Sequence, residues 1–182
     1  MLRKAPLRTI RLRLGTSVTR SGSLELGWLR FRCAIGRNGV TASKREGDGA
    51  TPAGTWKLDE VLWRSDRNLG RRVACALPAR AIRPDQGWCD APADRNYNRA
   101  IRHPYPARAE RLWREDHLYD IIVVLGYNRR PRLRERGSAI FLHVARPDYA
   151  PTEGCIALRE RDLRLLLSRV GRRSQIAIGQ QF

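Results

Sequence analysis

Apolar and polar residues alternate in the first part of the chain. TIRLRLG (residues 9–15) alternates without interruption, and SLELGWLRFRCAIG (residues 23–36) alternates with one slip of phase near Gly27. A period of two is typical of strands that bury one face, and a turn or bulge at Gly27 explains the slip. We therefore predict strands over both segments and a third strand over WKLDEVLW (residues 56–63).

Two later segments are apolar at almost every position. They are YDIIVVLGY (residues 119–127) and SAIFLHVA (residues 138–145). Continuous apolar runs of this length are typical of strands that are buried on both faces. We predict two core strands here, and a last short strand over QIAIG (residues 175–179).

Two segments have the residue spacing of short helices. PARAERLWRED (residues 106–116) begins with a proline, which is favoured in the first turn of a helix. RERDLRLLLSRV (residues 159–170) places three leucines and Val170 on one face, as an amphipathic helix does. We predict a helix over each segment.

The remaining segments predict loops and connections. Residues 36–56 are dense in Gly, Pro, Asp and Thr, residues 64–105 lack a clean period, and residues 128–137 are highly charged. A stretch as long as 64–105 inside a compact domain is typical of a functional loop or lid. The whole pattern predicts one β-rich α+β domain over residues 1–182, built as a sandwich with short helices packed at one side.

Composition adds a large positive charge to this picture. Hydrophobic residues make up 42% of the chain and charged residues 30%, which is a globular mixture, and the formal net charge is +18. Such a charge attracts nucleic acid, an anionic envelope polymer or a membrane surface. The basic residues are spread along the chain without a recognition-helix, zinc-finger or RNA-binding signature. We therefore expect no specific nucleic-acid partner.

The cysteines and the N-terminal residues leave the compartment open. The four cysteines form no CxxC pair and share no metal-ligand spacing with the three histidines, so we expect no metal site. Cys75 and Cys89 either pair in an oxidising compartment or remain buried thiols. No signal peptide and no segment of membrane-spanning length is visible.

His143 and Cys155 are the candidate catalytic residues. Taken alone, His143 is readily interpreted as a core histidine bonded to a carbonyl, and Cys155 as a buried structural cysteine. However, a loop of eleven residues joins the two positions, which is short enough to return the chain beside its strand. A thiol needs a base near neutral pH, and an imidazole is the usual one. Gly154 permits a tight bend at which backbone N–H groups can hold an oxyanion.

The segment HVARPDYAPTEGCIAL (residues 143–158) resembles the catalytic signature of the YkuD-type L,D-transpeptidases, which are bacterial cell-wall enzymes. KREGDGATPAGTW (residues 44–56) resembles the TP-x-G segment of that family, and YDIIVVLGYN and GSAIFLH resemble its two core strands. The likeness covers roughly residues 30–160. It implies a β-sandwich-like catalytic domain with Cys155 as nucleophile and His143 as base.

The resemblance also implies roles for neighbouring groups. Gly154 matches the glycine before the nucleophile, and Thr152 stands where the family has Ser or Thr. A backbone carbonyl just after the histidine, that of Val144 or a neighbour, is implied to orient the ring. The implied surroundings are the periplasm or cell envelope, and we expect a monomer that needs no cofactor.

The reaction implied is acyl transfer on peptidoglycan stem peptides. Cys155 attacks the carbonyl that precedes a terminal D-amino acid, which leaves, and the resulting thioester is transferred to an amine. With water as acceptor the same chemistry makes the protein an L,D-carboxypeptidase or endopeptidase. The alternative from a different class is a basic binding module for wall polymer or nucleic acid.

The sequence departs from the family pattern at two positions. Glu153 replaces the usual histidine before Gly-Cys, and a carboxylate there raises the pKa of the thiol unless it points away or pairs with an arginine. Ala157 stands where the family commonly has Arg or Asn, which bears on donor specificity.

Four further residues are candidates for substrate binding. Arg146 or Arg159 would hold a substrate carboxylate in place of the residue missing at position 157, because arginine binds carboxylates through two parallel hydrogen bonds. Tyr97 and Asn98 lie in the irregular segment that we expect to cap a cleft.

Overall fold

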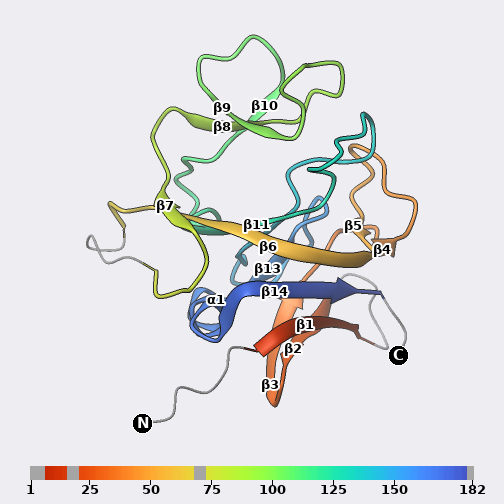
Figure 1. Ribbon diagram of the computed structural model, residues 1–182, viewed down its shortest axis with the longest axis vertical. Coiled ribbons are helices and arrows are strands. Elements are labelled where there is room, and N and C mark those ends of the chain that lie inside the picture. The colour runs from red at the N-terminus through yellow and green to blue at the C-terminus, as the bar shows by residue number, and fades with distance from the viewer. Residues whose placement is uncertain (1–6, 16–20, 68–72, 180–182) are drawn as a thin grey trace.

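The protein folds around one closed β-sheet. The structure is a computed structural model that describes residues 7–15, 21–67 and 73–179 (Figure 1). The main sheet consists of β1 (Leu7–Leu14), β2 (Ser21–Leu26), β3 (Leu29–Ala34), β6 (Gly54–Trp63), β7 (Ala79–Ala81), β11 (Ile121–Leu125), β12 (Phe141–Val144), β13 (Ile156–Leu158) and β14 (Val170–Ile178). The strand order is β11-β12-β13-β3-β2-β1-β14-β6-β7, and β11 also pairs with β6.

This last pairing makes the sheet a barrel rather than the sandwich that we expected. The long strand β6 pairs through residues 54–57 with β14 and through residues 58–63 with β11. A register irregularity between Val124 and Leu125 bends the strands where the two pairings meet. Because β6 pairs with both β14 and β11, the strands from β11 to β6 close into a ring. β7 pairs with β6 but is not part of this ring.

The segments with clear periodicity are confirmed as strands. The slip at Gly27 is a turn: this glycine has φ 62° and joins β2 to β3 in a hairpin. The predicted loop at residues 36–56 contains two short paired strands, β4 (Val40–Thr41) and β5 (Thr51–Pro52). Apolar side chains of the barrel strands form one main cluster.

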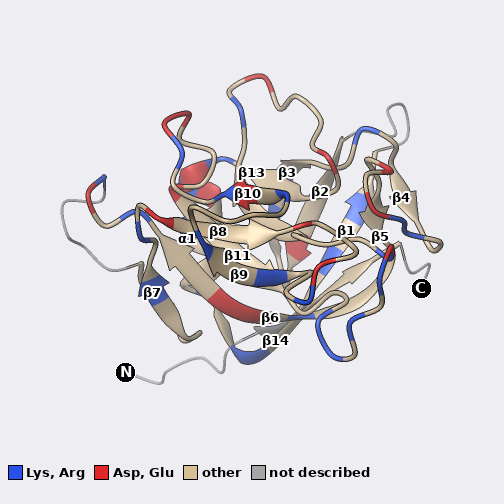
Figure 2. Cartoon of the chain, turned by 90° about the horizontal axis from the view of Figure 1, so that it is seen from above, with Lys and Arg blue, Asp and Glu red and all other residues tan. Residues whose placement is uncertain are grey.

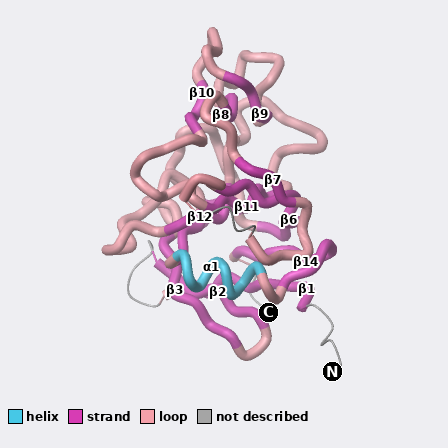
Figure 3. The backbone as a smooth tube through the Cα atoms, turned by 90° about the vertical axis from the view of Figure 1, so that its left-hand side faces the viewer, coloured by secondary structure: helices cyan, strands magenta, loops and turns pink. Residues whose placement is uncertain are grey.

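One of the two expected helices is present. The helix α1 (Glu160–Leu167) buries Leu163, Leu166 and Leu167 in the main cluster, as their spacing predicted. It ends before Val170, because that residue begins β14 and pairs with Leu7 instead. In Figure 3 the helix lies beside the barrel, at the end away from β8, β9 and β10.

The expected helix at residues 106–116 is wrong. Residues 109–111 form β10 (Ala109–Arg111), which pairs with β8 (Gln86–Cys89), and β8 pairs in turn with β9 (Arg99–Arg102). A short segment is only marginally helical by itself, so pairing with a neighbouring strand decides its structure. We call this three-stranded sheet and its connections, residues 86–111, the cap; it stands above the barrel in Figures 1 and 3.

The cap is packed onto the outer face of β11 and β12. A second apolar cluster joins Trp88 of the cap to Tyr119 and Phe141. The rings of Trp88 and Phe141 meet edge to face with centroids 5.2 Å apart. Among the residues that the structure describes, no helix is long and apolar enough to cross a membrane.

Candidate active site

His143 and Cys155 lie on neighbouring parallel strands. β12 and β13 pair with Leu142 opposite Ile156 and His143 opposite Ala157. The residues that precede this pair, Phe141 and Cys155, are also neighbours. The Phe141 N–H donates a hydrogen bond to the Cys155 thiol sulfur (3.4 Å). Since alternate residues of a strand share a face, the histidine and cysteine side chains project from the same face.

The ring of His143 is held in one tautomer. Its Nδ1 lies 2.8 Å from the carbonyl oxygen of Val144 and donates to it, which leaves Nε2 as the acceptor. The Tyr119 ring packs edge to face against the His143 ring, with the two ring centroids 5.3 Å apart. Burial lowers the pKa of His143 to about 4, although the bond to Val144 acts in the opposite direction. The imidazole is therefore neutral near pH 7 and able to accept a proton.

Cys155 is half-buried and carries a neutral thiol at rest. Its Sγ–H donates to the carbonyl oxygen of Ala139 (3.2 Å). Burial, together with the nearby charge of Glu110, raises the pKa of the thiol to about 12, although the Phe141 N–H and Lys44 act in the opposite direction. Free thiolate is consequently scarce near neutral pH, so the thiol needs a base at the moment of attack.

The turn before Cys155 is fixed by Thr152 and Gly154. The Thr152 hydroxyl donates to the carbonyl oxygen of Cys155 (2.6 Å) and accepts from the N–H of Gly154 (3.2 Å). Gly154 has φ 135°, and a Cβ at this position would lie 2.8 Å from the carbonyl oxygen of Ala50. Only glycine fits this close approach of two loops, which explains its place before the cysteine.

Glu153 points away from the thiol. Its carboxylate is exposed and forms an ion pair with Arg37. Its charge is not among the causes that raise the pKa of Cys155. The departure from the family pattern at this position therefore leaves the electrostatics of the thiol unchanged.

A cavity of about 590 Å³ opens over His143 and Cys155. Its walls come from the cap, the segment before β11, the loop around Lys44 and the turn before β13. Its charged lining residues are Lys44, Glu46, Asp90, Arg108, Glu110, Arg114, Arg146 and Glu153. Arg146 is exposed at the cavity and Ala157 lies in its buried wall.

The other three substrate-binding candidates do not line this cavity. Arg159 lies at the start of α1 with its guanidinium 5.6 Å from the ring of Tyr149. Tyr97 is buried and donates its hydroxyl hydrogen bond to Glu46, which does line the cavity. Arg159 therefore lies outside this cavity, and Tyr97 reaches it only through Glu46; a role of either in substrate binding stays a prediction.

Asn98 is also buried, and it joins the cap to the backbone beside the thiol. Its side-chain oxygen accepts from the Trp88 indole N–H (2.9 Å) and from the N–H of Ala139 (3.1 Å). Its side-chain nitrogen donates to the carbonyls of Tyr127 (3.1 Å) and Asn128 (2.7 Å). All four bonds are internal, so Asn98 positions the residue whose carbonyl holds the Cys155 thiol.

Sequence reasoning missed the group formed by Glu110, Tyr119 and Arg114. The Tyr119 hydroxyl donates to Glu110 Oε1 (2.5 Å), and the Arg114 guanidinium lies 5.1 Å from the Tyr119 ring. The sequence predicts a helix over residues 106–116, and nothing in that local pattern relates Glu110 to Cys155. Only the pairing of β10 with β8 brings it over the site.

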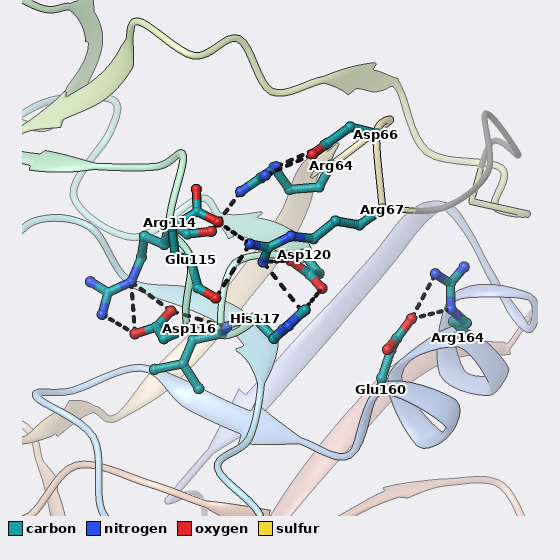
Figure 4. A network of polar contacts seen from close by, with 11 residues as sticks. Arg64, Asp66, Arg67, Arg114, Glu115, Asp116, His117, Asp120, Glu160 and Arg164 are labelled. Carbon is teal, nitrogen blue, oxygen red and sulfur yellow. Dashed lines mark hydrogen bonds and ion pairs between the residues drawn. The ribbon is translucent and has the colours of Figure 1, made fainter.

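Ion pairs hold the segment that carries Arg114 and Tyr119 (Figure 4). Arg67 binds Asp120 (2.8 Å) and Glu115 (2.6 Å), while Arg64 donates to the carbonyl oxygen of Arg114 (2.5 Å). Arg114 itself pairs with Asp116, as Figure 4 shows. The wall of the cavity next to His143 is thus braced before any ligand arrives.

The described residues contain no cluster of three or more His, Cys, Asp or Glu side chains that would hold a metal ion. Cys89 is a buried free thiol, so the possible bond to Cys75 is not formed in this structure. Cys75 instead donates to the carbonyl oxygen of Leu77 (3.6 Å).

A barrel that places a cysteine and a buried neutral histidine at one cavity defines a cysteine acyltransferase-like site. The family model described as the YkuD L,D-transpeptidase catalytic domain matches residues 16–178, which is nearly the whole chain. The chain therefore belongs to the YkuD family. This is a family of cysteine L,D-transpeptidases that act on peptidoglycan and are typically cell-envelope enzymes. No curated protein and no solved structure gives a significant match.

Proposed function

We propose that the protein is a cysteine L,D-transpeptidase that acts on peptidoglycan stem peptides in the cell envelope, as a monomer. One observation carries the proposal: the Cys155 thiol and a neutral His143, held in the Nδ1–H tautomer by Val144, share one face at a single cavity. Membership of the YkuD family supports the same reaction class.

The first step is acylation of Cys155. His143 Nε2 takes the thiol proton as the sulfur leaves the Ala139 carbonyl and attacks the carbonyl carbon that precedes a terminal D-amino acid. Because the pKa of His143 is lowered to about 4 and that of Cys155 raised to about 12, the proton moves during attack rather than beforehand. The imidazolium then gives the proton to the leaving amine, and a thioester remains.

The second step transfers the acyl group from Cys155 to an amine. The acceptor nitrogen attacks the thioester carbonyl, the C–S bond breaks, and the sulfur takes a proton to restore the thiol. Backbone N–H groups at the Gly154 bend are candidates for holding the oxyanion in both steps. Water as acceptor would give carboxypeptidase activity by the same route.

Arg146 is the proposed partner of a substrate carboxylate. It is exposed at the cavity, and among the described residues no ion pair of its side chain is recorded. Arginine binds a carboxylate through two parallel hydrogen bonds. Ala157, in the buried wall, leaves room there that a longer side chain would fill.

The proposal is tested with disaccharide-tetrapeptide muropeptides, the intact protein and its Cys155→Ala variant, with products read by mass spectrometry. We expect a dimer that has lost one D-alanine, formed only with the intact cysteine. Shortened monomer without dimer would make water the acceptor. Full activity of the Cys155→Ala variant would overturn the proposal.

A further inference from the structure

The cap side of the cavity presents a carboxylate to the Cys155 thiol. Glu110 projects from β10, lines the cavity and is near enough that its charge raises the pKa of Cys155. Tyr119 links Glu110 to His143, because its hydroxyl binds Glu110 and its ring packs on the His143 ring. Glu110 therefore faces the reacting sulfur from the side opposite to β12 and β13.

One oxygen of this carboxylate is engaged and the other is available. The Tyr119 hydroxyl (2.5 Å) and the Arg114 guanidinium (3.9 Å) both contact Glu110 Oε1. Both of these contacts are to Oε1, and neither involves Glu110 Oε2. The side chain is thus oriented through one oxygen while the second remains able to bind a ligand.

The other carboxylates of the cavity each have a partner, and none of them is among the charges that raise the pKa of Cys155. Glu153 pairs with Arg37 at the rim, and Asp90 lies 3.1 Å from the guanidinium of Arg108. Glu46 accepts the hydroxyl hydrogen bond of Tyr97. Glu110 is the carboxylate of this cavity whose charge reaches the Cys155 thiol, which places it best to meet an amine that attacks there.

We propose that Glu110 binds the ammonium group of the acyl acceptor and takes its proton, so that the amine attacks the thioester on Cys155. This inference rests on the proposed function and adds the acceptor side to it. The ligand that Glu110 recognises is a primary ammonium on a second stem peptide. Water, which carries no charge and needs no prior deprotonation, does not require this residue.

The protons balance in this scheme. An ammonium, R–NH₃⁺, gives one proton to Glu110 and attacks as R–NH₂; the C–N bond forms and the C–S bond breaks. The second proton passes through His143 to the sulfur, which restores the Cys155 thiol. Glu110 then releases its proton to water.

The surroundings of Glu110 suit a proton acceptor. Burial raises its pKa, as do the charges of Asp90 and Asp116, while Tyr119 and Arg114 lower it. A carboxylate with a raised pKa is a better base than an exposed one.

The experiment compares Glu110→Gln with the intact protein on disaccharide-tetrapeptide muropeptides. The amide keeps the size of the side chain and removes its basicity. We expect the ratio of dimer to hydrolysed monomer to fall about 100-fold, the size of a typical general-base contribution, while the initial release of D-alanine stays within about threefold. Glu153→Gln, at the same cavity but paired with Arg37, is the matched control and should keep the ratio.

A neutral nucleophile separates proton transfer from a structural effect. Hydroxylamine is largely unprotonated near neutral pH, so Glu110→Gln should still transfer the acyl group to it. An unchanged dimer ratio, or loss of transfer to hydroxylamine together with dimer formation, would overturn the inference about Glu110. Intact protein that releases D-alanine without forming dimer would also overturn it. Intact protein that releases no D-alanine would overturn the proposed function itself.

Discussion

Burial acts on His143 and Cys155 in opposite chemical directions. It removes the proton from the histidine and keeps the proton on the cysteine, so neither group carries a charge in the low-dielectric wall of the cavity. A preformed ion pair would cost desolvation free energy at rest. The neutral pair avoids that cost, and on the proposed mechanism it develops charge only during attack on the substrate.

The neutral state of His143 makes the fold sensitive to acid. Its pKa falls from 6.5 in the unfolded chain to about 4 in the folded protein, so the unfolded state binds a proton that the folded state does not. Stability is therefore complete above pH 6.5 and is lost as the pH falls towards 4, by about 3 kcal/mol for a shift of this size.

Urea unfolding of the intact protein and of His143→Gln at pH 7 and pH 4 measures this contribution. Carboxylates that titrate in the same range affect both proteins alike, so the difference between them isolates the histidine. We expect the variant to lose less stability on acidification. An equal loss in both proteins would contradict the prediction.

The cap is the element whose attachment decides the geometry of the site. It brings Glu110 over the thiol and, through Asn98, fixes Ala139, whose φ of 51° lies in the left-handed region. The contacts between cap and barrel join residues about 40 positions apart, as in the bond from Asn98 to Ala139. A loosened cap would therefore change the environment of Cys155 without touching it.

Substitution of Asn98 tests this attachment. Asn98→Ala removes four buried hydrogen bonds. Each contributes about 0.5–1.5 kcal/mol, so we expect a loss of roughly 2–6 kcal/mol in the free energy of unfolding. Asn96→Ala, in the same loop, removes one side-chain bond to Tyr105 and should cost about 1 kcal/mol. Chemical denaturation gives both values, and equal losses would contradict the assigned role.

Strands and helices were predictable from the sequence where the pattern that specifies them lies within one short segment. The alternation in residues 9–15 and 23–36 reports burial of one face and is visible in the sequence itself. The strand at residues 109–111 was missed because its pairing with β8 is a tertiary interaction that no short window contains. Closure of the barrel was missed for the same reason, since it depends on β6 meeting β11.

The residues of the candidate site were likewise predictable only where their signal lies within one segment. His143 and Cys155 could be found because a glycine bend and an isolated polar side chain stand out within one segment. Glu110 and Tyr119 could not, because their importance lies in contact between two separate elements. Asn98 was found as a polar residue in a loop, but its burial and its four internal bonds were not visible.

The charge belongs to the molecule as a whole. Lys and Arg residues occur on loops and strands on several sides of the described chain (Figure 2), in keeping with the formal net charge of +18. A distributed charge of this size raises the local concentration of an anionic polymer without selecting a sequence or a residue. On the proposed function, we expect the charge to favour encounter with the wall and the cavity to provide recognition.

Ionic strength should separate these two contributions. Screening shortens the reach of charge from about 10 Å at 0.1 M salt to about 3 Å at 1 M. We expect binding to isolated peptidoglycan sacculi, measured by co-sedimentation, to weaken at least about tenfold over this range. Turnover of a soluble muropeptide should change far less, and sacculus binding that ignores salt would contradict the prediction.

The hydrogen bond from the Cys155 thiol to the Ala139 carbonyl belongs to an environment that affects how readily this cysteine is oxidised. Peroxides oxidise the thiolate far faster than the thiol, and the cell envelope is an oxidising place. With its pKa raised to about 12, Cys155 offers almost no thiolate between turnovers. The same burial that, on the proposed mechanism, makes Cys155 depend on a base should also slow its oxidation to sulfenic acid between turnovers.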